Sequence, residues 1–229
     1  PTLDEPTHAE AARMYLGLRA YLQSGGLSGY TLHYGECGED GRFTQLPLLA
    51  ASNLLADGYG YAAEGDSTAA VLVAAMQTLC GAAGFTEMYM MDFETDAICF
   101  CHAGEGNWAT SCGTNRPRLI DRYLGEGGLE NPPTILFTPK AGRATLTSLA
   151  PLNGDRLRLI AAPGEMLPKN DLCGCEMPYF FWRPDSGVTN CIRGWLKNGG
   201  THHEVISLGD VSTRWQMLCD MWDVEYVQV

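Results

Sequence analysis

The chain has 229 residues, of which 27 are acidic and 15 are basic, so its formal net charge is −12. This length permits one large domain or two small ones. Nucleic acids and anionic membranes would be repelled by the acidic balance. No apolar run approaches the roughly 20 residues that a membrane-spanning helix needs. The sequence therefore predicts no nucleic-acid and no membrane partner.

The beginning of the chain and its cysteines indicate a reducing compartment. Residues 1–6 have neither the basic nor the apolar region of a signal peptide. Nine cysteines at irregular positions, largely within apolar stretches, suit reduced, buried thiols better than a disulfide scaffold. We expect a cytoplasmic protein. Because the chain has no initiator Met and opens directly into a helix cap, we also expect it to be a piece of a longer protein.

Residues 1–83 predict a partial parallel α/β unit. The expected elements are, in order, a helix at 9–24, a strand at 29–34, a helix at 48–56, a strand at 58–63 and a helix at 68–80. Alternation of helices and strands is typical of a parallel sheet covered by helices. A domain boundary is expected near residues 81–84, where glycine and alanine follow the third helix.

Residues 84–229 predict a small antiparallel, Greek-key-like β-barrel with two helices. Short strands are expected at 87–93, 97–101, 134–138, 144–150, 156–161, 177–182, 203–208 and 224–229, and helices at 188–197 and 211–222. Residues 104–131 form the longest stretch without a clear period, and loops of that length are often functional or mobile.

Two glutamates stand out as candidate site residues. Glu64 follows a short strand and precedes a helix, where open α/β sheets present catalytic groups. It could instead act only as a favourable charge at the start of the helix. Glu87 lies in an apolar run, where an ionised carboxylate is costly unless a cation or hydrogen bonds compensate it. Its alternative is an outward-facing position on a strand.

His102 ends an apolar strand and begins a glycine-rich loop, a usual place for a site side chain. A structural histidine is the plainer alternative. Another alternative is a zinc site that combines His102 with Cys99, Cys101, Cys173 and Cys175. Neither Cys-x-Cys pair has the two to four intervening residues that structural zinc sites usually show.

His202 and His203 follow Gly199-Gly200, whose small size lets other groups approach closely. Neighbouring residues of a strand point to opposite faces, so one imidazole of the pair should reach a given metal. Two carboxylates and up to three imidazoles from separate segments are the ligand mix of a catalytic Mn²⁺, Mg²⁺ or Zn²⁺ site.

The order of these residues resembles the C-terminal half of the L-arabinose isomerase family and its L-fucose isomerase-like relatives. The resemblance rests on Glu64, Glu87, His102 and His203 in this order, with support from Gln45-Leu46-Pro47, Gly58-Tyr59-Gly60-Tyr61, Trp182-Arg183-Pro184 and Gly194-Trp195-Leu196. It implies that residues 1–83 are the end of the family's middle α/β domain and that 84–229 are its C-terminal barrel.

The resemblance also implies roles for individual residues. Glu64, Glu87, His102 and His203 would be the metal ligands, and His202 would have a supporting or substrate-facing role. Tyr34, Gln45 and Phe85 would contact the sugar, although core packing is an alternative for both aromatic residues. The ligand mix favours Mn²⁺, with Mg²⁺, Co²⁺ or Zn²⁺ as further possibilities.

The implied activity is metal-dependent aldose–ketose isomerisation through a cis-enediol or enediolate, with Glu64 and Glu87 moving the proton. The family builds its sites across subunits. We therefore expect a homo-oligomer that also needs the N-terminal portion missing here, and little or no activity from this fragment alone.

The chain departs from the family in two strings that follow ligand positions. Met88-Tyr89-Met90-Met91 stands where the family has an Asp-Tyr-Thr-Tyr string, and Ala103-Gly104-Glu105-Gly106-Asn107 stands where it has a Met-Leu-Glu string. These changes leave open a non-catalytic sugar-binding or regulatory relative. They also leave open a metal-dependent hydrolase or lyase that uses the same ligands.

Overall fold

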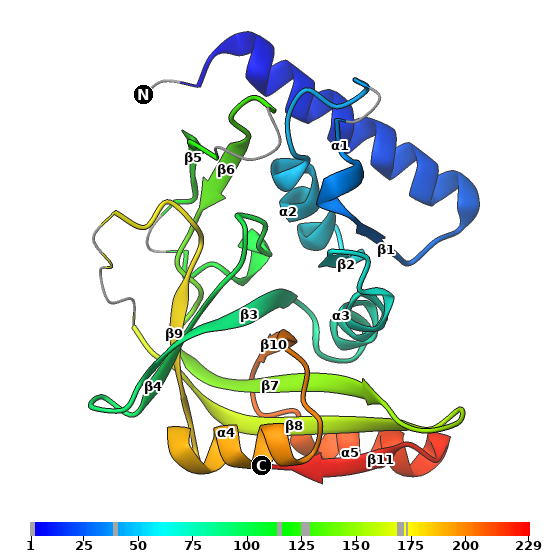
Figure 1. Cartoon of the computed structure of the whole chain (residues 1–229), viewed down its shortest axis with the longest axis vertical. Coiled ribbons are helices and arrows are strands. Elements are labelled where there is room, and N and C mark those ends of the chain that lie inside the picture. The colour runs from blue at the N-terminus through cyan, green and yellow to red at the C-terminus, as the bar shows by residue number, and fades with distance from the viewer. Residues whose placement is uncertain (1–2, 39–40, 114–115, 125–128, 169–171, 173) are drawn as a thin grey trace.

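The computed structural model describes the whole chain except residues 1–2, 39–40, 114–115, 125–128, 169–171 and 173. It has a helical part that contains the N-terminus and a β-barrel that contains the C-terminus (Figure 1). The fold therefore combines a small parallel α/β unit with a barrel, as the sequence predicts.

The helical part is built around two short parallel strands. Its elements are α1 (Glu5–Gly25), β1 (Gly29–Leu32), the 3-10 turn η1 (Tyr34–Glu36), α2 (Leu48–Ala56), β2 (Gly60–Ala63) and α3 (Ser67–Cys80). β1 and β2 pair in parallel register, which confirms the predicted α/β unit. Helix α1 begins after Asp4, whose side chain accepts a hydrogen bond from the backbone N–H of Thr7, and it ends at Gly26 with a left-handed backbone.

Six antiparallel strands of the described residues close into the barrel. They are β3 (Ala83–Asp92), β4 (Ala97–Cys101), β7 (Gly142–Pro151), β8 (Leu157–Met166), β9 (Phe180–Pro184) and β10 (His203–Leu208). The order around the barrel is β8-β7-β10-β3-β4-β9, and β9 pairs with β8 to close it. This confirms the predicted antiparallel barrel.

Further elements surround this barrel. They are the 3-10 turn η2 (Trp108–Thr110), β5 (Arg118–Asp121), β6 (Pro133–Leu136), α4 (Val188–Lys197), α5 (Ser212–Trp222) and β11 (Glu225–Gln228). β5 and β6 form a separate antiparallel pair, and β11 adds to the outside of β8 in parallel. The stretch 104–131 thus contains η2 and β5, while its residues 114–115 and 125–128 lie outside the described part.

Strands β3 and β8 are among the barrel strands that are longer than predicted. β3 begins at Ala83, four residues before the predicted start, and its first four residues are all buried. Burial on both faces removes the alternation by which a strand is recognised. β8 continues to Met166 through Pro163 and Gly164, residues that normally argue against a strand. A Cβ on Gly164 would lie 2.5 Å from the Trp182 ring, so the glycine permits close packing there.

Helix α3 packs on the outer face of the barrel. One hydrophobic cluster joins Val73 and Met76 of α3 to Phe85 of β3, Val205 of β10 and Trp215 of α5. A separate cluster fills the barrel interior, with Phe100, Trp182 and Trp195 among its large side chains. The contact between α3 and the barrel wall brings the turn after β2 close to the start of β10. The domain boundary near residue 83 stays a prediction.

Several cysteines of the described residues are buried thiols. Cys99, Cys101, Cys191 and Cys219 are buried and form no disulfide. Burial raises the pKa of Cys99 and of Cys219 to about 11, which keeps both thiols protonated at neutral pH. Cys173, which the alternative zinc site would use, lies outside the described residues.

None of the helices in the described part of the chain is long and apolar enough to cross a bilayer.

Candidate functional site

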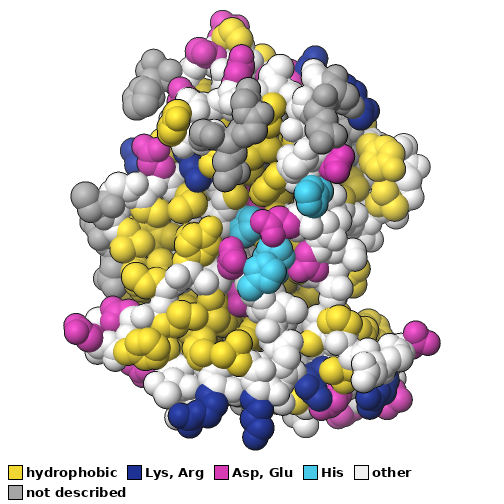
Figure 2. Space-filling model, viewed as in Figure 1, with side chains coloured by type: hydrophobic (Ala, Val, Ile, Leu, Met, Phe, Trp, Pro, Cys, Tyr) yellow, Lys and Arg dark blue, Asp and Glu magenta, His cyan; other side chains and the backbone are white. Residues whose placement is uncertain are grey.

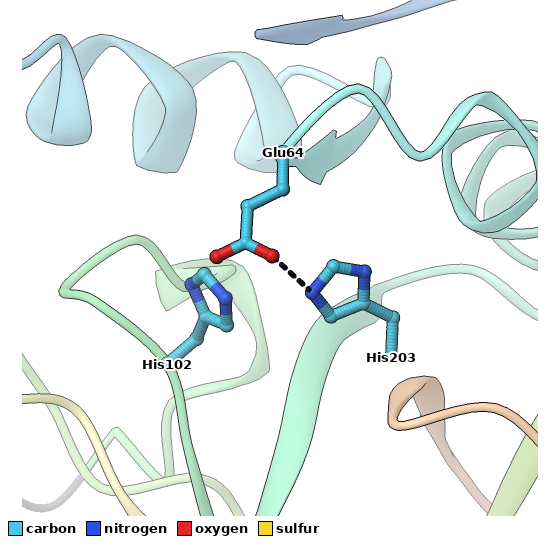
Figure 3. Close-up of side chains that lie close together, drawn as sticks. All are labelled: Glu64, His102 and His203. Carbon is cyan, nitrogen blue, oxygen red and sulfur yellow. Dashed lines mark ion pairs between the residues drawn. The ribbon is translucent and has the colours of Figure 1, made fainter. Parts of the chain in front are cut away.

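Three of the four predicted metal ligands meet between the helical part and the barrel. Glu64 follows β2, His102 follows β4, and His203 begins β10. One potential ligand atom from each of these side chains lies within 4.8 Å of the others. Figure 3 shows both imidazole rings turned toward the Glu64 carboxylate. Among the described residues, this is the group of side chains that could hold a metal ion.

Glu64 occupies the tight turn between β2 and α3. Its φ is +60°, a left-handed backbone that is uncommon outside glycine. The turn closes with a hydrogen bond of 3.0 Å from the N–H of Asp66 to the carbonyl of Ala63. Half of the Glu64 side chain is exposed. The unusual backbone thus presents the carboxylate at the barrel wall, and such backbones are frequent at functional sites.

His203 has a carboxylate partner at one ring nitrogen and no hydrogen-bond partner at the other. Its Nδ1 lies 3.0 Å from Asp66 Oδ2, and its Nε2 lies 3.6 Å from Glu64 Oε2. Nε2 is buried and has no hydrogen-bond partner in the described structure. A carboxylate at Nδ1 fixes the tautomer that leaves the lone pair on Nε2. His203 therefore has the orientation of a metal ligand.

His102 repeats this arrangement. Its Nδ1 lies 3.0 Å from Glu105 Oε1, and its Nε2 lies 4.0 Å from Glu87 Oε2. Burial lowers the pKa of His102, but the charge and hydrogen bond of Glu105 outweigh it, so the pKa is raised. Phe85 belongs to the hydrophobic cluster that includes Val73 and Met76 of α3, and its ring centroid lies 4.8 Å from His102 and 4.9 Å from His203.

Glu87 borders this group without joining it. On β3 it stands opposite His203 of β10 and Cys101 of β4. Its carboxylate approaches His102, whereas the closest grouping contains Glu64, His102 and His203. The predicted fourth ligand thus lies beside the other three, and its role as a ligand stays a prediction.

Glu105 is a site residue that the sequence reasoning missed. It is buried and accepts hydrogen bonds from the hydroxyls of Tyr34 and Tyr61, besides its bond with His102. Burial raises the pKa of Glu105, but His102 and the Tyr34 bond more than offset it, so the pKa is lowered. One signal was available, since Glu105 takes the third position after His102, where the family string also has a glutamate.

Asp66 is the second partner that the sequence reasoning did not find. One of its carboxylate oxygens caps helix α3 by accepting a hydrogen bond from the N–H of Ala69. In the structure its second oxygen binds His203, so it has the same relation to His203 that Glu105 has to His102. Asp66 lies three residues after the end of β2, and nothing at this position in the sequence indicates a contact with His203 of β10.

The four predicted sugar-contacting residues have different surroundings. Phe85 lies against both imidazoles, and the ring of the exposed His202 lies tilted beside that of His203, with centroids 4.1 Å apart. The Tyr34 hydroxyl binds Glu105. The buried Gln45 donates a 2.9 Å hydrogen bond to the carbonyl of Thr7 in α1. Their contacts to a sugar stay predictions, and the structure does not bring Gln45 to the histidines.

Negative charge gathers around the two imidazoles. The carboxylates are those of Glu64, Asp66, Glu87 and Glu105, and none of them pairs with a lysine or arginine among the described residues. In Figure 2 the acidic and histidine side chains lie together in the hollow at the middle of the molecule. Excess carboxylate and a buried, unpartnered imidazole nitrogen fit a divalent cation with mixed oxygen and nitrogen ligands.

Comparison with known proteins places the sequence in a family. Residues 4–82 match the model of the L-arabinose isomerase central domain, and residues 82–225 match that of the L-arabinose isomerase C-terminal domain. The chain belongs to the L-arabinose isomerase family. This confirms the resemblance drawn from the ordered motifs.

Individual relatives of the L-arabinose isomerase family agree with this assignment. L-arabinose isomerase of Mannheimia succiniciproducens is 30% identical over 227 residues, which are 96% of this chain and 45% of that protein. L-arabinose isomerase of Geobacillus kaustophilus is 30% identical over 223 residues, which are 96% of this chain and 44% of that protein. L-arabinose isomerase of a Nocardioides species is 31% identical over 95% of this chain and 44% of that protein. The chain spans less than half the length of these relatives.

Proposed function

We propose that the chain carries the metal-binding and proton-transfer part of an aldose–ketose isomerase. One observation carries the proposal: His102 and His203 are each held at Nδ1 by a carboxylate and turn Nε2 toward the acidic group that contains Glu64. Membership of the L-arabinose isomerase family supports it.

Glu64, Glu87, His102 and His203 would hold the metal, with Mn²⁺ favoured by the mixed ligands and Mg²⁺, Co²⁺ or Zn²⁺ as alternatives. When bound, the ion would supply positive charge that stabilises the negative oxygen formed on the substrate. Asp66 and Glu105 orient the imidazoles through their Nδ1 atoms. Replacing such partners typically lowers metal affinity 10- to 100-fold.

The proton transfer falls to the two glutamates. Conversion of an aldose to a ketose removes the proton from C2 and delivers one to C1, while a hydroxyl proton moves between the two oxygens. Glu64 or Glu87, as a carboxylate, can accept the C2 proton and return it to C1 through a cis-enediol. Phe85 closes the site on the side that faces α3, where water would otherwise compete for that proton.

The complete site is proposed to need more than this chain. Because the relatives are more than twice as long, we propose that a further portion and neighbouring subunits of a homo-oligomer complete the sugar pocket. A small aldose is the proposed substrate and the cytoplasm the proposed location. The chain alone should then bind metal yet isomerise sugars weakly or not at all.

Deuterium exchange tests the chemistry directly. The chain, fused behind the N-terminal half of the Mannheimia succiniciproducens relative, is incubated with Mn²⁺ and a panel of aldoses in D₂O, and the sugars are followed by NMR. We expect ketose and deuterium at the exchanged carbon, and loss of both in Glu64→Gln and Glu87→Gln. Sugar binding without exchange would instead support the non-catalytic relative, and unchanged exchange in both variants would contradict the mechanism.

A further inference from the structure

A buried guanidinium nitrogen without a hydrogen-bond partner lies near the site. Arg122 follows β5 and is only 9% exposed. Its Nη1 is buried and has no hydrogen-bond partner, and no carboxylate of the described residues forms an ion pair with it. The half-buried Arg158, by contrast, is paired with Glu225.

Arg122 packs against the loop that carries two site residues. A Cβ placed on Gly104 would lie 2.8 Å from Arg122 Nη1, so a side chain there would collide with the guanidinium. Gly104 stands between His102 and Glu105 and has a φ of +142°. Arg122 is also near enough to Tyr89 and Cys101 to oppose the rise that burial causes in the pKa of each. The cation therefore borders the candidate metal centre.

No anion of the described chain compensates this charge. Glu105, the nearest carboxylate along the loop, is bonded to His102, Tyr34 and Tyr61 through one oxygen, and it forms no ion pair with Arg122. Burying an unpaired guanidinium is costly, and proteins normally pair or solvate such groups. A ligand that brings its own anion would remove the penalty.

We propose that Arg122 binds a carboxylate of the substrate, so that the site takes an acidic sugar. The inference rests on the proposed isomerase function and names its substrate class. A guanidinium forms two parallel hydrogen bonds with one carboxylate, which suits a single unpaired arginine. A phosphate dianion fits less well, because one positive charge would face it together with Glu64, Glu87 and Glu105.

Calorimetric titration with matched sugars tests this assignment. D-galacturonate and D-galactose differ only at C6, and D-galactose 6-phosphate adds the dianion. Each is titrated, with and without Mn²⁺, into the fusion of the chain with the N-terminal half of the Mannheimia succiniciproducens relative. The variants are Arg122→Gln, Arg122→Lys and, as control, Arg118→Gln, which changes an exposed arginine of the neighbouring strand β5.

We expect D-galacturonate to bind the wild type and Arg118→Gln about 10- to 100-fold more tightly than D-galactose, the size of a charge-assisted pair. Arg122→Gln should abolish this preference, and Arg122→Lys should keep part of it. Equal binding of the two sugars, an unchanged preference in Arg122→Gln, or tighter binding of the phosphate would overturn the assignment.

Mn²⁺ binding separates this inference from the proposed function. We expect Arg122→Gln to bind Mn²⁺ as the wild type does, because Arg122 is not among the proposed ligands. A wild type that prefers D-galacturonate yet binds no Mn²⁺ would contradict the isomerase proposal and leave the carboxylate site standing. Normal Mn²⁺ binding by a wild type that does not prefer D-galacturonate would contradict the carboxylate site and leave the isomerase proposal standing.

Discussion

Asp66 uses its two carboxylate oxygens for two different tasks. Oδ1 accepts a 2.9 Å hydrogen bond from the N–H of Ala69 and so caps helix α3, while Oδ2 lies 3.0 Å from Nδ1 of His203. The two residues are 137 positions apart in the sequence. The side chain that begins a helix of the α/β unit therefore also orients a proposed metal ligand of the barrel.

Replacing Asp66 with Asn should separate these tasks. An amide has one acceptor oxygen, so an Asn that caps α3 turns its NH₂ group toward His203 and can no longer accept a hydrogen bond from Nδ1–H. We expect the helix cap to be kept, since Asn is a good cap residue, and Mn²⁺ affinity to fall about 10-fold or more because His203 loses its carboxylate. Calorimetry measures the affinity and urea unfolding the stability. Unchanged Mn²⁺ affinity would contradict the role given to Asp66.

The tyrosines around Glu105 should stabilise the fold. Tyr61→Phe removes a buried hydroxyl that donates to Glu105 over 3.1 Å. A buried carboxylate that loses a donor costs about 1–3 kcal/mol, so the free energy of unfolding in urea should drop by that amount. Tyr21→Phe, at an exposed tyrosine of α1, is the matched control and should change little. Equal stability of both variants would show that Glu105 does not depend on the hydroxyl.

Much of the fold follows from local sequence. The bounds of α2, β4, α4 and β10 agree with the prediction because proline, glycine or polar turns flank them. The proposed ligands were recognisable because each lies at an end of a strand or within an apolar run.

The missed features depend on tertiary contacts. Asp66 reads as a helix cap, and its second partner comes from a strand far along the chain. Arg122 is an ordinary arginine in sequence, and only the packing of β5 against the loop at Gly104 shows that it is buried without a partner. Likewise, the buried start of β3 has no alternation to reveal it.

Glu64→Gln should weaken metal binding and raise the stability of the metal-free protein. Without metal, the carboxylates of Glu64, Asp66 and Glu87 repel one another, so removal of one charge should raise the free energy of unfolding. The gain should be at most about 1 kcal/mol, because Glu64 is half exposed and solvent screens it. With Mn²⁺ present, the wild type should gain stability as the ion concentration rises, and the variant should not. Thermal unfolding with and without Mn²⁺ distinguishes these outcomes.

An ion pair on the barrel should make stability depend on pH. Both nitrogens of the Arg143 fork lie 2.7 Å from the oxygens of Asp185, and this bond holds the pKa of Asp185 below its ordinary value of 3.8. Because the folded-state pKa is the lower one, the stabilisation is present above the unfolded-state pKa and is lost as pH falls through the folded-state pKa.

Arg143→Gln measures this contribution. Both side chains are about half exposed, so we expect the variant to lose only about 0.5–1 kcal/mol at pH 7. The difference from the wild type should shrink as the pH is lowered from 5 to 2.5. A difference that stays constant over this range would mean that the charge of Asp185 is not its source.

Mn²⁺ titration by calorimetry tests the central claim most directly, with the wild type, Glu64→Gln, His203→Asn and, as control, His8→Asn on the exposed face of α1. The account predicts one tight site in the wild type and in His8→Asn. It predicts strong loss of binding in both Glu64→Gln and His203→Asn, since their ligand atoms lie within 4.8 Å of each other and of His102. Tight binding that survives both changes would show that the metal lies elsewhere and would contradict the account.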